Sequence, residues 1–135
     1  LTGVSGTQVE FRGYVPRERL RESLSVPDIH WLSLDPALEG LIVPSKFYGA
    51  AAVGRPILFV GDPAGEIARL IGEGGCGRVF APGQSAELAQ CLRELAAEPG
   101  LRAELGRNAR AFSERALSRS ARHAQWFALL RELAA

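Results

Sequence analysis

The chain has 135 residues, of which 47% are hydrophobic and 23% are charged, and its net charge is +1. These values predict one globular domain with a sizeable core. The small net charge argues against nucleic acid as a partner, because phosphate binding needs a basic face. No segment approaches the roughly 18 apolar residues that span a bilayer.

The first third of the chain predicts two strands and one helix. Residues 9–15 (VEFRGYV) alternate in hydrophobicity and indicate a short strand. Residues 16–26 indicate a helix, because Pro16 suits a first helical turn. Residues 28–34 (DIHWLSL) indicate a second strand, and a loop follows it.

The middle third predicts helices and strands in alternation. The small residues from Ser45 onward indicate a short helix that Gly54 ends, since glycine readily adopts the left-handed conformation. Residues 56–60 (PILFV) form a continuous apolar run, which is typical of a parallel strand covered on both faces. Residues 65–75 then indicate a helix with a glycine stop, and residues 77–83 a fourth strand.

The last third predicts a helix from about residue 86 to 97 that Ser85 caps, and further helices that begin near Pro99 and near Arg119. Strands joined by helical crossovers predict an α/β fold, namely a Rossmann-like parallel sheet with helices on both faces. Ligands of such sheets bind at the carboxyl ends of the strands. Two loops, residues 35–45 and 61–66, are therefore the first places to look for a site.

The first of these loops ends in a serine and a lysine. Lys46 is the only lysine, because the other basic residues among the 16 are arginines. A helix that starts at Ser45 points free N–H groups at an anion, and a compact ammonium suits phosphate. The alternative is a capping serine beside a solvated lysine.

Other polar residues are weaker candidates. Glu39 precedes Gly40, and its carboxylate can accept hydrogen bonds from sugar hydroxyls, or it can lie in water as an ordinary loop residue. His30 and His123 have no metal-ligand spacing, so we expect no metal site.

The cysteines and the C-terminal arginines are both explained without a catalytic role. The two cysteines form no CxxC pair and indicate buried free thiols. The arginines between residues 102 and 122 indicate a solvated helix face, or a surface that rests against anionic lipid.

The chain resembles the C-terminal half of a GT-B glycosyltransferase, in the large group of retaining enzymes that use nucleotide-sugar donors. The similarity is greatest over residues 39–71 (EGLIVPSKFYGAAAVGRPILFVGDPAGEIARLI), and residues 9–34 and 75–115 are also similar to segments of that family. The PSKxYG and AxGRP variant is frequent in enzymes that assemble bacterial surface polysaccharides.

The resemblance implies that residues 1–135 are the donor-binding domain of a two-domain enzyme. The absence of methionine likewise predicts a piece of a longer protein, cut near Leu1. The resemblance implies a nucleotide-diphosphate sugar as donor and no cofactor or essential metal. It also implies that an acceptor glycan or lipid-linked sugar binds an N-terminal domain outside this chain, so that the fragment alone is inactive. The expected location is the cytoplasm or the inner face of the membrane, with peripheral membrane contact.

The resemblance also assigns roles to individual residues. It places Glu39 near the sugar. The helix start at Ser45 and the ammonium of Lys46 are then suited to stabilise the leaving diphosphate, and we expect Lys46 to contact it. The family's second glutamate, which holds the ribose, falls at Gly49 here, so that another group has to hold the ribose. The backbone that follows the hexose and diphosphate is that of Gly40, Leu41, Ile42 and Val43.

A second interpretation remains open. The chain would then be a non-catalytic nucleotide-binding or interaction module of flavodoxin-like architecture, in which Gly49 marks a lost donor site. Binding of nucleotide sugars distinguishes the two interpretations.

Overall fold

The computed structural model describes residues 10–134. It contains three strands, six α-helices and three shorter helical turns in these residues. The strands are β1 (His30–Ser33), β2 (Ile57–Val60) and β3 (Gly77–Phe80). The helices are α1 (Leu20–Ser25), α2 (Lys46–Ala52), α3 (Glu66–Gly74), α4 (Ser85–Ala97), α5 (Pro99–Phe112) and α6 (Arg119–Leu133). The 3-10 turns are η1 (Arg17–Arg19) and η2 (Pro36–Leu38), and η3 (Ser113–Leu117) is a π-helical turn.

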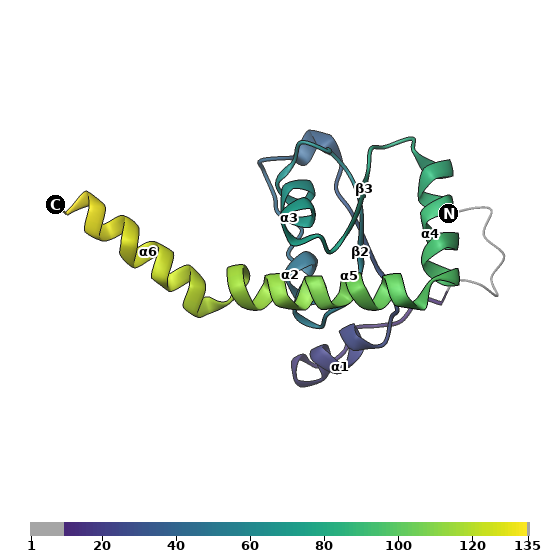
Figure 1. Cartoon of the computed structure of the whole chain (residues 1–135), viewed down its shortest axis with the longest axis horizontal. Coiled ribbons are helices and arrows are strands. Elements are labelled where there is room, and N and C mark those ends of the chain that lie inside the picture. The colour runs from purple at the N-terminus through teal and green to yellow at the C-terminus, as the bar shows by residue number, and fades with distance from the viewer. Residues whose placement is uncertain (1–9, 135) are drawn as a thin grey trace.

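The three strands form one parallel sheet in the order β1-β2-β3. Helices α2 and α3 lie on one side of the strands and α4 lies on the other, as Figure 1 shows. This arrangement confirms the predicted Rossmann-like α/β fold. It follows from the apolar run of β2, whose residues Ile57, Leu58 and Phe59 are all fully buried.

Successive side chains of β2 point to opposite faces of the sheet, so they belong to two separate hydrophobic clusters. Ile57 and Phe59 pack with α2 and α3, whereas Leu58 packs with α4. Cys76 lies in the first of these clusters, and burial raises the pKa of its thiol to about 11. Both cysteines are buried free thiols, as the sequence predicts.

Helix α5 closes the end of the sheet where β2 begins, below the strands in Figure 1. Gly106 of α5 lies so close to the backbone of Gly54 that a Cβ at Gly106 would overlap the Gly54 carbonyl oxygen. Gly54 itself has φ 71°, as predicted for the residue that ends α2. The carboxyl ends of the strands are therefore left at the opposite end of the molecule.

Two local predictions are wrong. Residues 10–15 of the predicted first strand form no strand, and Val9 lies outside the described residues. Their side chains find no sheet to pack on, and Phe11 and Tyr14 are exposed. Ser85 does not cap α4, because it is itself the first residue of that helix. Ser45 is in the αR conformation and makes no capping hydrogen bond either, contrary to the alternative of a capping serine.

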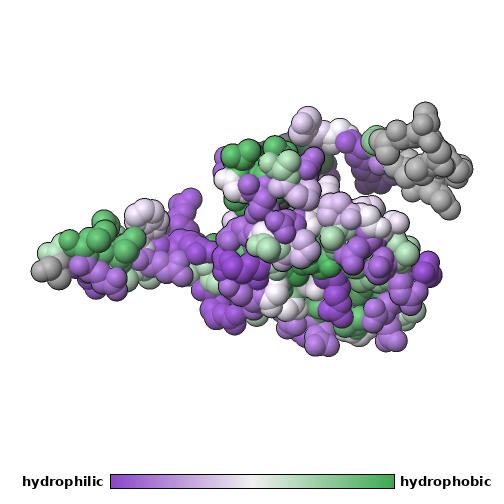
Figure 2. All heavy atoms as spheres, turned by 90° about the horizontal axis from the view of Figure 1, so that it is seen from above, coloured by the Kyte–Doolittle hydropathy of each residue, from purple (hydrophilic) through white to green (hydrophobic). Residues whose placement is uncertain are grey.

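Helix α6 extends away from the rest of the described chain (Figure 1). None of its residues is buried, and Trp126 and Phe127 are 63% and 61% exposed. Its apolar side chains gather toward the far end of the helix, as the view from above shows (Figure 2). No helix within residues 10–134 has the length and apolar character needed to cross a membrane.

Candidate functional site

A pocket of about 380 Å³ opens where β1 ends. One wall is β1 and the residue after it, and the other wall is the loop that leads into α2. Such a position at the carboxyl end of a parallel strand is where ligands of this fold class bind. The residues that line the pocket are Trp31, Leu32, Ser33, Leu34, Ile42, Val43, Pro44, Ser45 and Lys46.

Four of the predicted site residues therefore lie together in this pocket, namely Ile42, Val43, Ser45 and Lys46. Ser45 and Lys46 are exposed, and neither side chain has a hydrogen-bond or ion-pair partner among residues 10–134. The ammonium of Lys46 is thus available to an anion that enters the pocket.

The loop before Ile42 keeps its shape through backbone interactions. Gly40 has φ 79°, a conformation that side-chain-bearing residues rarely adopt. The N–H groups of Leu41 and Ile42 donate to the Leu38 carbonyl at 3.1 and 3.2 Å. Gly40 and Leu41 do not line the pocket, and Leu41 is 75% exposed.

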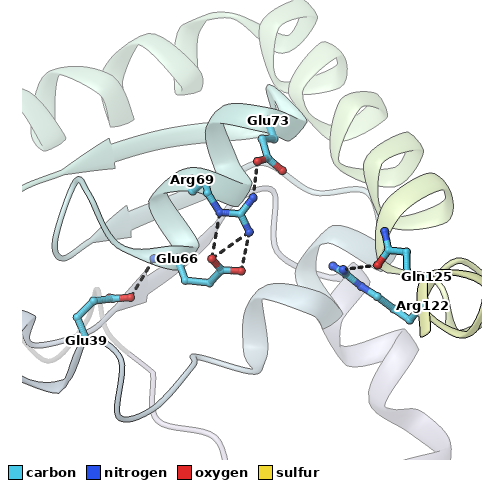
Figure 3. A network of polar contacts seen from close by, with 6 residues as sticks. All are labelled: Glu39, Glu66, Arg69, Glu73, Arg122 and Gln125. Carbon is cyan, nitrogen blue, oxygen red and sulfur yellow. Dashed lines mark hydrogen bonds and ion pairs between the residues drawn. The ribbon is translucent and has the colours of Figure 1, made fainter. Parts of the chain in front are cut away.

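Glu39 faces away from the pocket and toward α3. Its Oε1 accepts a hydrogen bond from the Glu66 N–H at 2.9 Å, at the start of that helix (Figure 3). Its Oε2 is buried and has no hydrogen-bond partner among the described residues. A Cβ at Gly65 would lie 2.5 Å from this oxygen, so the glycine makes room for the carboxylate. Glu39 therefore caps α3 and ties the pocket loop to it.

The side chain of Glu66 is directed to the surface of α3 (Figure 3). It pairs with Arg69 at 2.8 Å, and Arg69 also contacts Glu73. The two carboxylates raise the pKa of Arg69 above its ordinary value. All three side chains are about half exposed, so the network adds little to stability.

Gly49 also lies outside the pocket. A Cβ there would approach Leu24 Cδ1 of α1 to 2.9 Å. The position at which the resemblance leads us to expect a ribose-binding glutamate thus lies at the contact between α1 and α2.

Five residues of the pocket were not among the predicted site residues, namely Trp31, Leu32, Ser33, Leu34 and Pro44. Trp31 is 61% exposed although it lies in a strand. The sequence does contain a pattern that indicates Trp31 and Ser33. They alternate with the buried Leu32 and Leu34 and therefore face the other side of the sheet.

Residues 10–134 contain no group of three or more His, Cys, Asp or Glu side chains that could hold a metal ion. The pocket instead offers hydroxyls, backbone groups, one ammonium and one indole ring. Such a set can bind a polar ligand that carries negative charge.

A family model described as glycosyl transferase-like matches residues 2–128. The chain belongs to this family. The protein named "Probable glycosyltransferase WbjE" of Pseudomonas aeruginosa is 32% identical to it over 88 residues, which are 65% of this chain and 22% of that protein. The chain thus spans about a fifth of the length of this relative. No solved structure matches the chain.

The role of Glu39 as a cap can be measured by replacing it. Glu39→Ala removes the acceptor of the Glu66 N–H and should lower the free energy of unfolding by about 1 kcal/mol. Amide hydrogen exchange at Glu66 should become faster. Glu39→Gln keeps an acceptor oxygen and should retain most of the protection. Equal protection of the Glu66 amide in the wild-type and alanine proteins would show that this hydrogen bond does not form.

Proposed function

We propose that this domain binds the nucleotide-diphosphate sugar of a glycosyltransferase. The observation that carries the proposal is the pocket at the end of β1, in which Lys46 and Ser45 have no other partner among the described residues. Family membership supports glycosyl transfer as the reaction. The nature of the donor is the further step of the proposal.

Lys46 would act on the leaving group. When a glycosyl bond to a nucleoside diphosphate breaks, negative charge grows on the diphosphate while the sugar becomes oxocarbenium-like. A fixed cation and hydrogen-bond donors at that position stabilise the transition state more than the ground state. Lys46 supplies the cation, and Ser45 supplies a hydroxyl next to it. No metal or cofactor enters this proposal.

The remaining predicted residues would hold the site in shape. Ile42 and Val43 present backbone groups along the donor. Glu39 serves the pocket by holding its loop against α3, because both of its oxygens are turned inward. Trp31 offers an aromatic face on which a nucleobase or sugar ring can stack.

The proposal extends to the whole protein by analogy with the GT-B enzymes. There the acceptor, a glycan or lipid-linked sugar, would bind a second domain, and this domain alone would be inactive. The pathway would be polysaccharide or glycolipid synthesis in the cytoplasm or at the inner membrane face.

Calorimetry on the full-length protein with uridine, guanosine and adenosine diphosphate sugars tests the proposal. We expect one base to bind at least tenfold more tightly than the other two. The alternative, a non-catalytic interaction module, predicts heats no larger than dilution for all three, and that outcome would refute a donor site.

A further inference from the structure

A second hollow lies at the other end of α2, away from the carboxyl ends of the strands. This α1–α2 groove has a volume of about 450 Å³, within the range of small-molecule pockets. Its floor is apolar and includes Leu20, Leu24 and Val53. The groove shares no lining residue with the pocket at the end of β1. Helix α1, which supplies part of it, lies below α5 in Figure 1.

The rim of the groove carries only one sign of charge. Arg17, Arg21 and Arg110 line it, and no acidic residue does. Arg110 already donates to Glu114 and to the Ala52 carbonyl. Arg17 and Arg21 have no ion-pair partner among residues 10–134, because the neighbouring Glu22 pairs with Arg19 instead.

The two unpaired arginines are four residues apart around one helical turn, which places them on the same side as Leu20 and Leu24. Two guanidinium groups together offer more N–H donors than the two oxygens of one carboxylate can accept. A phosphate monoester has three terminal oxygens and is therefore the better match for both arginines. The apolar floor beside them suits an alkyl chain. The charge and the shape of the groove thus complement a small amphiphile with a phosphate head.

Gly49 keeps this groove open. It lines the floor, and a side chain at this position would meet Leu24. A glutamate here, which the resemblance leads one to expect, would place a carboxylate beside the arginines and offset part of their charge. Gly49, where this chain departs from the motif, is thus part of the α1–α2 groove.

We propose that the α1–α2 groove binds an alkyl phosphate, with Arg17 and Arg21 on the phosphate and Leu20, Leu24 and Val53 on the chain. Nothing in this assignment depends on the donor pocket.

Octyl phosphate below its micelle concentration is a suitable probe, followed by NMR at the Gly49 amide and the arginine Nε groups. We expect it to bind at least tenfold more tightly than inorganic phosphate or octanol. The double variant Arg17→Ala/Arg21→Ala should weaken binding at least tenfold. The control Arg107→Ala/Arg131→Ala removes the same charge from exposed arginines outside the groove that likewise have no ion-pair partner among residues 10–134, and it should change affinity less than twofold.

Several results would overturn the proposal. Equal affinity for inorganic phosphate would indicate a simple anion site, and equal affinity for octanol a purely apolar one. An equal loss in the two double variants would indicate unspecific charge attraction. Binding to anionic lipid vesicles without binding to octyl phosphate would assign the arginines to a membrane surface instead.

Discussion

Gly77→Ala is expected to lower the free energy of unfolding by about 3 kcal/mol or more, because β3 has no room for a methyl group there. Gly77 is the register partner of Ile57 in β2, and a Cβ at this position would overlap the Ile57 carbonyl oxygen. The obstacle is backbone of a neighbouring strand, which cannot turn aside as a side chain can. The change should shift the thermal midpoint downward by roughly 10 °C.

Gly72→Ala is the matched control. Gly72 lies in the last turn of α3, and nothing is within 4 Å of the position where its Cβ would stand. Alanine favours the helix over glycine by about 0.5–1 kcal/mol, so this variant should unfold at a slightly higher denaturant concentration. If both variants shift stability in the same direction, the close approach of β3 to β2 is not as described.

The parts of the fold that the sequence predicts well depend on short-range patterns. The apolar run of β2 and the left-handed Gly75 that ends α3 need no knowledge of distant residues. Residues 10–15 have a strand-like alternation too, but a strand also needs a neighbour that supplies hydrogen bonds. In the described structure, residues 10–15 pair with neither edge strand of the sheet, β1 or β3.

In the candidate site, too, some features follow from neighbouring residues in the sequence and others depend on distant ones. The sequence places Ser45 and Lys46 next to each other in the chain, and the pocket keeps them together. Glu39 meets an amide that lies 27 residues away, so no local pattern predicts its partner. The packing of Gly49 on Leu24 is likewise a tertiary contact. Resemblance to a family assigns a role to a position, whereas the contacts of this chain decide which atoms are free to perform it.

Lys46→Ala should weaken binding of the nucleotide-diphosphate sugar roughly 10- to 100-fold, because a charge-assisted hydrogen bond contributes about 1.5–3 kcal/mol. It should also lower the turnover of the full-length enzyme at least tenfold, since loss of one stabilising donor raises the barrier by about 2–4 kcal/mol. Stability should change by less than about 0.5 kcal/mol, because Lys46 is exposed. Calorimetry, steady-state kinetics and thermal unfolding measure the three effects separately.

Lys46→Arg separates charge from shape. The guanidinium keeps the charge but is wider and planar, and every other basic residue of the chain is already an arginine. If the pocket needs a compact ammonium, the arginine variant should recover less than half of the lost binding free energy, and Arg93→Ala on α4 should change nothing. Full recovery by arginine would mean that charge alone matters at this position. Unchanged binding in Lys46→Ala would instead show that the lysine does not contact the ligand. The loop before α2 would then have to bind its ligand through backbone groups and Ser45.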